Sequence, residues 1–140
     1  VYGNGELKPH FEEMVSDLKL NVRVHPAVLD IFDKYIESSM LLMTSLYEPF
    51  GLVLVEAMSC GLPVVAFDCP YGPADIIHDG EDGFLVEDRN LKMYSERVCL
   101  LMENEMIRQQ MGKAAILSSQ RYSSERIMCQ WNQLFTEMVK

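Results

Sequence analysis

The sequence has few basic residues, no long apolar run and no visible signal-peptide pattern, and these absences guide the expected class of protein. Only 12 Lys and Arg residues stand against 21 Asp and Glu residues, which gives a net charge of −9. Such an acidic chain repels phosphate backbones and anionic lipid, which argues against nucleic-acid binding. No stretch approaches the roughly 18 consecutive apolar residues of a membrane span, and the first residues lack a basic segment followed by an apolar one. We therefore expect a cytoplasmic protein, membrane-peripheral at most, without a nucleic-acid partner.

The cysteines also lack any arrangement that carries chemistry. Cys60, Cys69, Cys99 and Cys129 form no Cys-x-x-Cys pair and have no histidine near them at the spacing of a zinc site. We interpret them as free cytosolic thiols and expect no metal site. What is present is ordinary globular composition, with 49% apolar and 24% charged residues. A chain of this length and composition forms a core without disulfides or metal.

Apolar periodicity divides the chain into alternating helices and strands. Helices are predicted where apolar residues recur at helical spacing, and strands at short apolar runs. The predicted helices are residues 11–18, 28–35, 52–60, 74–77, 91–103, 105–119 and 124–139, and the predicted strands are residues 22–24, 40–44, 64–67 and 84–86. This alternation predicts an α/β fold: one domain over residues 1–140, a doubly wound Rossmann-like parallel sheet with helices on both faces and a helical C-terminal segment.

The segment at residues 52–60 fits a strand or a helix by periodicity alone, because its first four residues are all apolar. Its end favours a helix. Gly61 suits the left-handed position after a helix, and Pro63 follows two residues later.

The loop before this helix is the richest candidate for a site. Ligands of an open parallel sheet bind beyond the carboxyl ends of the strands, and the loop at residues 45–51 follows such an end. It supplies Glu48 and then Gly51 at the start of the predicted helix. The first N–H groups of a helix lack intrahelical partners and favour an anion, typically phosphate. Gly51 lets a ligand approach the backbone closely.

Glu56 is unusual because it lies among apolar residues on a helix that should be almost wholly buried. A buried carboxylate needs a cation, hydrogen-bond donors or water. Glu48 and Glu56 are eight residues apart, and eight helical steps bring the two directions to within about 80° of each other. One interpretation is a nucleotide sugar, with Glu56 on the ribose diol and Glu48 on the sugar hydroxyls. The alternative, favoured by spacing alone, is a core salt bridge for Glu56 and a solvated Glu48.

Residues 48–58, followed by Gly61-Leu62-Pro63-Val64-Val65, resemble the Glu-x7-Glu signature of the retaining glycosyltransferases of GT-B fold often called family four. Residues 1–5 are similar to the family's glycine turn after the second strand, residues 75–86 to its Asp-Gly segment, and residues 122–131 to its closing helix. Residues 69–73 are similar to bacterial enzymes of capsular or lipopolysaccharide synthesis. The sequence is therefore identified as a member of this family, and specifically as its C-terminal, donor-binding domain.

The resemblance implies a function for each site residue. Glu48 would be the catalytic residue and would contact the donor sugar. The implied donor-binding residues are Phe50, Gly51, Leu52, Glu56 and Val28. The first three would contact sugar or diphosphate through backbone N–H groups, Glu56 would bind the ribose, and Val28 would border the nucleobase. The family stabilises the leaving diphosphate without a metal, through the helix start and an upstream Arg and Lys. Leu46 and Pro49 depart from common family residues, and neither departure excludes donor binding.

The implied activity is retaining transfer of a hexose-type sugar from a nucleotide diphosphate to a glycan or lipid-linked acceptor. No cofactor is implied, since the nucleotide sugar is a substrate. Two alternatives are a GT-B nucleotide-sugar epimerase and a non-catalytic nucleotide-binding or interaction module.

We also expect the chain to be an N-terminally truncated fragment that lacks the acceptor domain. In the usual doubly wound strand order, residues 22–24 and 40–44 would be the third and fourth strands, with the first two strands between them. A chain without those strands exposes sheet edges. We therefore expect this fragment to self-associate and to be inactive alone.

Overall fold

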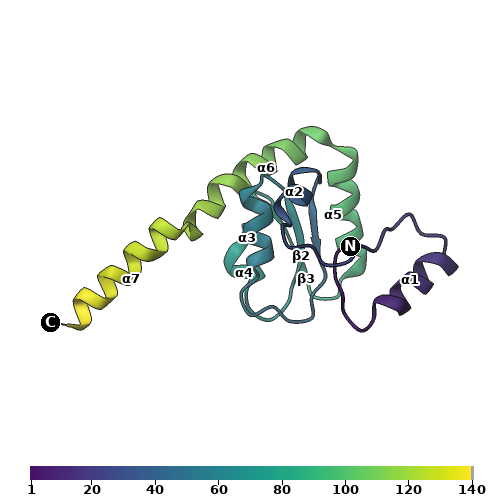
Figure 1. Cartoon of the computed structure of the whole chain (residues 1–140). Coiled ribbons are helices and arrows are strands. Elements are labelled where there is room, and N and C mark those ends of the chain that lie inside the picture. Colours follow the sequence, from purple (N-terminus) through teal and green to yellow (C-terminus); the bar gives the residue numbers. More distant parts are fainter. Residues whose placement is uncertain (140) are drawn as a thin grey trace. The chain divides into compact units, whose positions relative to one another are not determined.

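The computed structural model describes residues 1–139, which divide into two compact units (Figure 1). The first unit is Val1–Ile31, and the second begins at Phe32. No helix among residues 1–139 is long and apolar enough to cross a membrane.

The first unit contains one helix, α1 (Lys8–Asp17), with Pro9 in its first turn. This confirms the predicted helix, which begins a few residues earlier than expected. The predicted strand at residues 22–24 is wrong: within the described chain the only pairing here is a single parallel bridge between Tyr2 and His25. The rings of these two residues stack at 4.9 Å. The backbone ladder ends there because the next N–H on this side, that of Ala27, donates to the Asn4 side-chain Oδ1 at 3.2 Å instead of to a backbone carbonyl.

The second unit is built on a parallel sheet of three strands. These are β1 (Leu41–Met43), β2 (Val64–Asp68) and β3 (Gly83–Glu87), in the order β1-β2-β3. Leu42 lies opposite Val65, and Ala66 lies opposite Leu85. The sheet confirms three predicted strands and the α/β fold class.

Helices cover both faces of this sheet (Figure 1). The helices of this unit are α2 (Phe32–Ile36), α3 (Leu52–Ser59), α4 (Pro73–Ile76), α5 (Leu91–Glu103), α6 (Glu105–Ser119) and α7 (Ser124–Met138), with a short 3-10 turn, η1 (Gln120–Tyr122), before α7. The last helix, α7, extends away from the sheet (Figure 1). Alternate residues of a strand point to opposite faces. Val65 and Phe67 therefore join the buried cluster with Tyr94 and Leu101 of α5, whereas Val64 and Ala66 face the other side.

One predicted helix is shorter than expected, and the predicted C-terminal helix is confirmed. The predicted helix at residues 28–35 is only partly right, because α2 is a single turn that begins at Phe32. Asp30 precedes it, and Asp competes with helical bonds and favours positions just outside a helix. The C-terminal helix α7 is confirmed, and it keeps the apolar side chains Trp131, Leu134 and Phe135 exposed.

Candidate functional site

The loop after β1 brings Glu48 to the start of α3. Gly51 precedes the helix with φ +96°, a left-handed conformation that glycine adopts readily. A Cβ at this position would also lie 3.4 Å from Glu48 Cγ and 3.2 Å from Leu54 Cδ1. The positive φ therefore favours glycine at position 51, and a Cβ there would be in tight contact with Leu54 and in ordinary contact with Glu48.

The start of α3 presents a row of free donors. The first bond of the helix runs from the Leu54 N–H to the Gly51 carbonyl, at 2.9 Å. Within residues 1–139 no acceptor contacts the N–H groups of the preceding positions Phe50, Gly51, Leu52 and Val53. Free N–H groups and the positive end of the helix dipole together favour a bound anion. Three of these four positions, Phe50, Gly51 and Leu52, are predicted donor-binding residues.

A second loop, residues 69–73, packs against the loop that carries Glu48 and Phe50. The Glu48 N–H reaches the Pro70 carbonyl at 3.4 Å. A Cβ on Gly72 would overlap the Phe50 carbonyl and lie 3.0 Å from the Glu48 carbonyl. The Tyr71 ring stands edge-on to Tyr47, with 5.7 Å between ring centroids. The backbone shape around Glu48 is thus set by contacts with a segment more than 20 residues away.

Tyr122 of η1 closes the same region from the C-terminal side. Its ring stands edge-on to Phe50 at 5.4 Å, and its hydroxyl donates to the Asp75 carbonyl at 2.8 Å. Phe50 is therefore held between its own loop and the turn that precedes α7.

Glu56 is the fifth residue of α3, about one turn after its start, and is half-buried. Its Oε2 accepts a hydrogen bond of 3.1 Å from the Tyr35 hydroxyl. Burial, followed by the hydrogen bond to Glu56 and the charge on Glu56, raises the pKa of Tyr35 well above its usual value of 10.0. Among residues 1–139 Glu56 makes no ion pair with a Lys, Arg or His. The alternative interpretation of Glu56 as half of a core salt bridge is therefore wrong.

A pocket of about 560 Å³ opens on this side of α3. Its lining combines one carboxylate with apolar and hydroxyl side chains: Phe32, Leu52, Val55, Glu56, Ser59, Ile116, Ser119, Gln120, Tyr122, Ser123 and Ser124. This volume is within the range of small-molecule sites. A carboxylate, several hydroxyls and aromatic rings suit a ligand with both polar and ring parts, such as a nucleoside.

The predicted site residues fall into three groups. Leu52 and Glu56 line the pocket. Glu48, Phe50 and Gly51 lie on the loop that leads into α3, and Phe50 contacts the pocket residue Tyr122. Val28 belongs to the first unit, where its side chain is exposed.

Sequence reasoning missed Tyr35, Gly72 and Tyr122. Each contacts a site residue across a long stretch of chain, so no local spacing signals it. The only local sign is the Gly-Pro pair at residues 72–73, which marks a turn but not what the turn supports.

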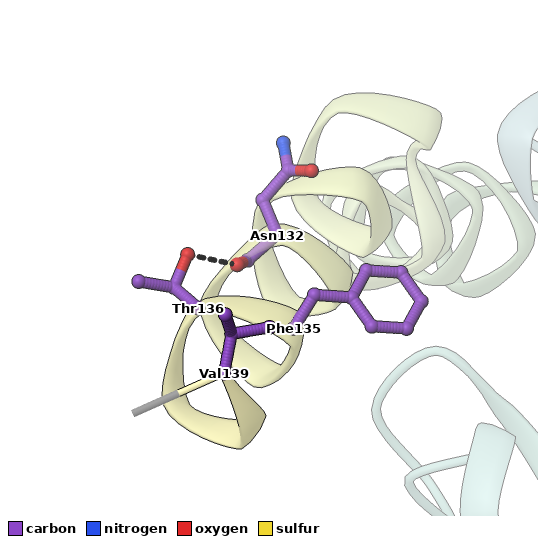
Figure 2. Close-up of a pocket in the computed structure, with 4 residues that line it drawn as sticks. All are labelled: Asn132, Phe135, Thr136 and Val139. Atoms are coloured by element: carbon purple, nitrogen blue, oxygen red, sulfur yellow. Dashed lines mark hydrogen bonds between the residues drawn. The ribbon is translucent and has the colours of Figure 1, made fainter.

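A further hollow of about 550 Å³ lies on α7 and is lined by Asn132, Phe135, Thr136 and Val139 (Figure 2). All four residues belong to one helical stretch, and the Thr136 hydroxyl donates to the Asn132 carbonyl at 2.7 Å. The lining has no titratable group, which argues against chemistry at this place. Across residues 1–139 no group of three or more His, Cys, Asp or Glu side chains is placed to hold a metal ion.

A family model and several curated proteins, most of them glycosyltransferases, match this chain. A family model described as "Glycosyl transferases group 1" matches residues 1–118. The poly(ribitol-phosphate) alpha-N-acetylglucosaminyltransferase of Staphylococcus aureus is 35% identical over 96% of this chain and 28% of its own length. An exopolysaccharide phosphotransferase of Streptomyces coelicolor is 32% identical over 99% of this chain and 15% of its length. An amylovoran biosynthesis glycosyltransferase of Erwinia amylovora is 32% identical over 96% of this chain and 38% of its own length.

Solved structures match in the same way. A variant of S. aureus TarM, in complex with Fondaparinux, alpha-GlcNAc-glycerol and UDP, superposes with a TM-score of 0.89 at 32% identity, over 96% of this chain and 28% of that one. The pneumococcal O-GlcNAc transferase GtfA, in complex with UDP and GlcNAc, superposes with a TM-score of 0.85 at 24% identity. The match covers 99% of this chain and 29% of that one, and it shows likeness of fold. The chain thus spans well under half the length of these relatives.

Proposed function

Because the chain belongs to the group 1 glycosyltransferase family, we propose that it forms the donor-binding part of an enzyme that transfers a sugar from a nucleotide diphosphate to a glycan or lipid-linked acceptor. One observation carries the proposal. The segment from Glu48 to Glu56 places free N–H groups at the start of α3 between two carboxylates, one of which lines a pocket of nucleotide size. The UDP in the TarM complex supports a uridine nucleotide as the first donor to test.

In this proposal each group acts on one part of the donor. The diphosphate lies at the N–H groups of Phe50, Gly51 and Leu52. The Glu56 carboxylate accepts hydrogen bonds from the two ribose hydroxyls, and Glu48 contacts the transferred sugar as the catalytic residue. Val28 belongs to the first unit, and its predicted place beside the nucleobase stays a prediction.

The helix start supplies the electrostatic stabilisation that bond cleavage needs. Negative charge develops on the diphosphate as the sugar departs, and fixed N–H donors aimed at that charge lower the barrier without reorganisation. We therefore include metal independence in the proposal, together with retention of the anomeric configuration. The acceptor would be bound by a further domain, as the family resemblance implies.

Two substitutions in the full-length protein test these functions. Glu56→Gln should weaken UDP binding by roughly 10- to 100-fold, since a hydrogen bond to a charged group contributes about 1.5–3 kcal/mol. Glu48→Gln should lower turnover of the sugar nucleotide and leave UDP affinity unchanged. Glu103→Gln, at an exposed position of α5, is the matched control and should change neither quantity.

Calorimetry with UDP and product analysis with a panel of UDP-sugars provide the readouts. Chelation of divalent ions should leave turnover unchanged. Product analysis also separates sugar transfer from epimerisation and from phosphosugar transfer. Wild-type affinity and turnover in both site variants would show that the assigned functions are wrong.

A further inference from the structure

We propose that Tyr35 is a positioning residue for the donor: its hydroxyl fixes the Glu56 carboxylate in the orientation that meets the ribose. The inference rests on the proposed function of Glu56 and adds the group that prepares it. The contact is the 3.1 Å hydrogen bond from the Tyr35 hydroxyl to Glu56 Oε2, between residues 21 positions apart.

Tyr35 is placed for this by the single turn of α2. It is the one buried residue of that turn, only 6% exposed. Its ring packs edge-on against Phe32 at 6.0 Å, and Phe32 and Glu56 line the same pocket. Lys34 and Glu37 form an ion pair across the end of this turn, with 2.7 Å between Lys34 Nζ and Glu37 Oε2. The ring is therefore held by packing, and the hydroxyl is directed at the carboxylate.

The hydrogen bond leaves Glu56 free to bind a diol. A carboxylate offers about four acceptor positions on its two oxygens, and the phenol occupies one of them. Oε1 and the second position on Oε2 remain for two adjacent hydroxyls. Without Tyr35 the half-buried side chain of Glu56 would sample several rotamers, and ribose binding would have to order it. Orienting a ligand group in advance raises affinity by removing that entropic cost.

A comparison with Tyr94 separates this contact from ordinary core packing. Tyr94 is also buried, and its hydroxyl lies 3.0 Å from the Val65 carbonyl and 3.4 Å from the Met43 carbonyl. Tyr94 therefore satisfies backbone groups of the sheet. The Tyr35 hydroxyl has Glu56 as its sole hydrogen-bond partner among residues 1–139, and that partner lines the pocket. Tyr94 thus hydrogen-bonds to the backbone of the sheet, whereas Tyr35 hydrogen-bonds to a side chain that lines the pocket.

The test is Tyr35→Phe in the full-length protein, with UDP as the probe. The variant keeps the ring and removes the hydroxyl, so we expect Kd for UDP to rise roughly tenfold, as for loss of one hydrogen bond to a charged group. KM for the sugar nucleotide should rise by a similar factor, with kcat at saturation unchanged. In a Glu56→Gln background the same change should have little further effect, because the two residues act through one contact.

Tyr94→Phe is the matched control. It also removes a buried hydroxyl and should lower the melting temperature, yet UDP affinity should stay at the wild-type value. A merely structural function of Tyr35 predicts the same pattern in both variants: reduced stability and unchanged affinity. That result, or an undiminished effect of Tyr35→Phe in the Glu56→Gln background, would overturn the inference alone. Failure of Glu56→Gln to change UDP affinity would overturn the proposed function of Glu56, and this inference with it.

Discussion

At the residue scale, the backbone around Glu48 depends on the absence of a side chain at Gly72. Gly72 has φ +54° and lies directly against the Phe50 and Glu48 carbonyls. The neighbouring Tyr71 is also left-handed, with φ +68°. Left-handed backbone at a non-glycine residue stores strain that the surrounding structure must support. Two consecutive left-handed residues therefore shape the loop that presents the candidate catalytic carboxylate.

Gly72→Ala should consequently damage the site as well as the fold. The new methyl group would displace the Phe50 carbonyl and with it Glu48, so we expect a large loss of turnover together with weaker UDP-sugar binding. Gly80→Ala is the control for backbone strain, because Gly80 has φ +80° and open space around its Cα. It should cost only the strain of a left-handed alanine, about 1–2 kcal/mol, and leave turnover intact. Equal losses of turnover in the two variants would show that the contact with Phe50 is unimportant.

The sequence predicts the residues of this site whose signal is local. The spacing of Glu48 and Glu56 and the glycine at position 51 are visible in one short segment, and the structure places all three around the start of α3. Tyr35 and Gly72 could not be predicted, because their functions consist of contacts 21 and 22 residues away along the chain. Such contacts exist only once the helices have packed.

At the element scale, α5 joins two strands of the sheet through one tyrosine. The Tyr94 hydroxyl bridges the carbonyls of Met43 on β1 and Val65 on β2. Its ring packs against Phe67 at 4.5 Å. β1 has only three residues and pairs with β2, so this bridge adds support where the ladder is shortest.

Tyr94→Phe should therefore lower the stability of the second unit and change its pH dependence. Loss of the hydrogen bond should cost about 1 kcal/mol at neutral pH. Burial raises the pKa of Tyr94 from 10.0 to about 12, so folding favours the neutral phenol. Its contribution is complete below pH 10 and is lost as the pH rises through 12. Denaturant titrations between pH 9 and 12 should show a shallower decline for the variant, and parallel curves for variant and wild type would contradict this assignment.

The sequence predicts a helix or strand correctly where the apolar pattern of the segment itself is strong enough to determine it. The strands β1, β2 and β3 are apolar runs, and β2, the central strand of the parallel sheet, is buried over its first four residues. Their order along the chain is also their order in space. The predicted strand at residues 22–24 was wrong because a strand requires a neighbour to pair with, and within the described chain His25 finds only Tyr2. Periodicity reports what a segment prefers, whereas pairing depends on the rest of the fold.

At the scale of the whole molecule, the surfaces left uncovered within residues 1–139 include one edge of the sheet and one face of α7. β1 pairs only with β2, so its other edge is open and Leu42 is exposed. The face of α7 with Trp131, Leu134 and Phe135 is exposed as well. Open strand edges and large apolar faces promote association. Self-association of this chain stays a prediction, and these are the surfaces on which it would depend.

The four thiols offer a measure of how the second unit opens as a whole. Cys99 and Cys129 are exposed, Cys60 is half-buried, and Cys69 is 2% exposed. Burial, more than any nearby charge, raises the pKa of the Cys69 thiol. The thiolate is the reactive form, so Cys69 should react with a thiol reagent only when the core around β2 opens. Peptide mapping after timed labelling should find Cys99 and Cys129 modified first, Cys60 later and Cys69 last.

Destabilising variants should accelerate the labelling of the buried Cys69 and leave that of the exposed Cys99 unchanged. If the reaction of Cys69 requires global opening, each 1.4 kcal/mol of lost stability should make it about tenfold faster. Gly112→Ala on α6 is a suitable variant, because its methyl group would overlap the Gly61 carbonyl just after α3 and force the two helices apart. Cys99 should react at the same rate in variant and wild type, since its exposure does not depend on opening. Labelling of Cys69 at a rate independent of Gly112→Ala would show instead that a local fluctuation of residues 69–73 exposes it, and that the loop behind Glu48 moves without the rest of the unit.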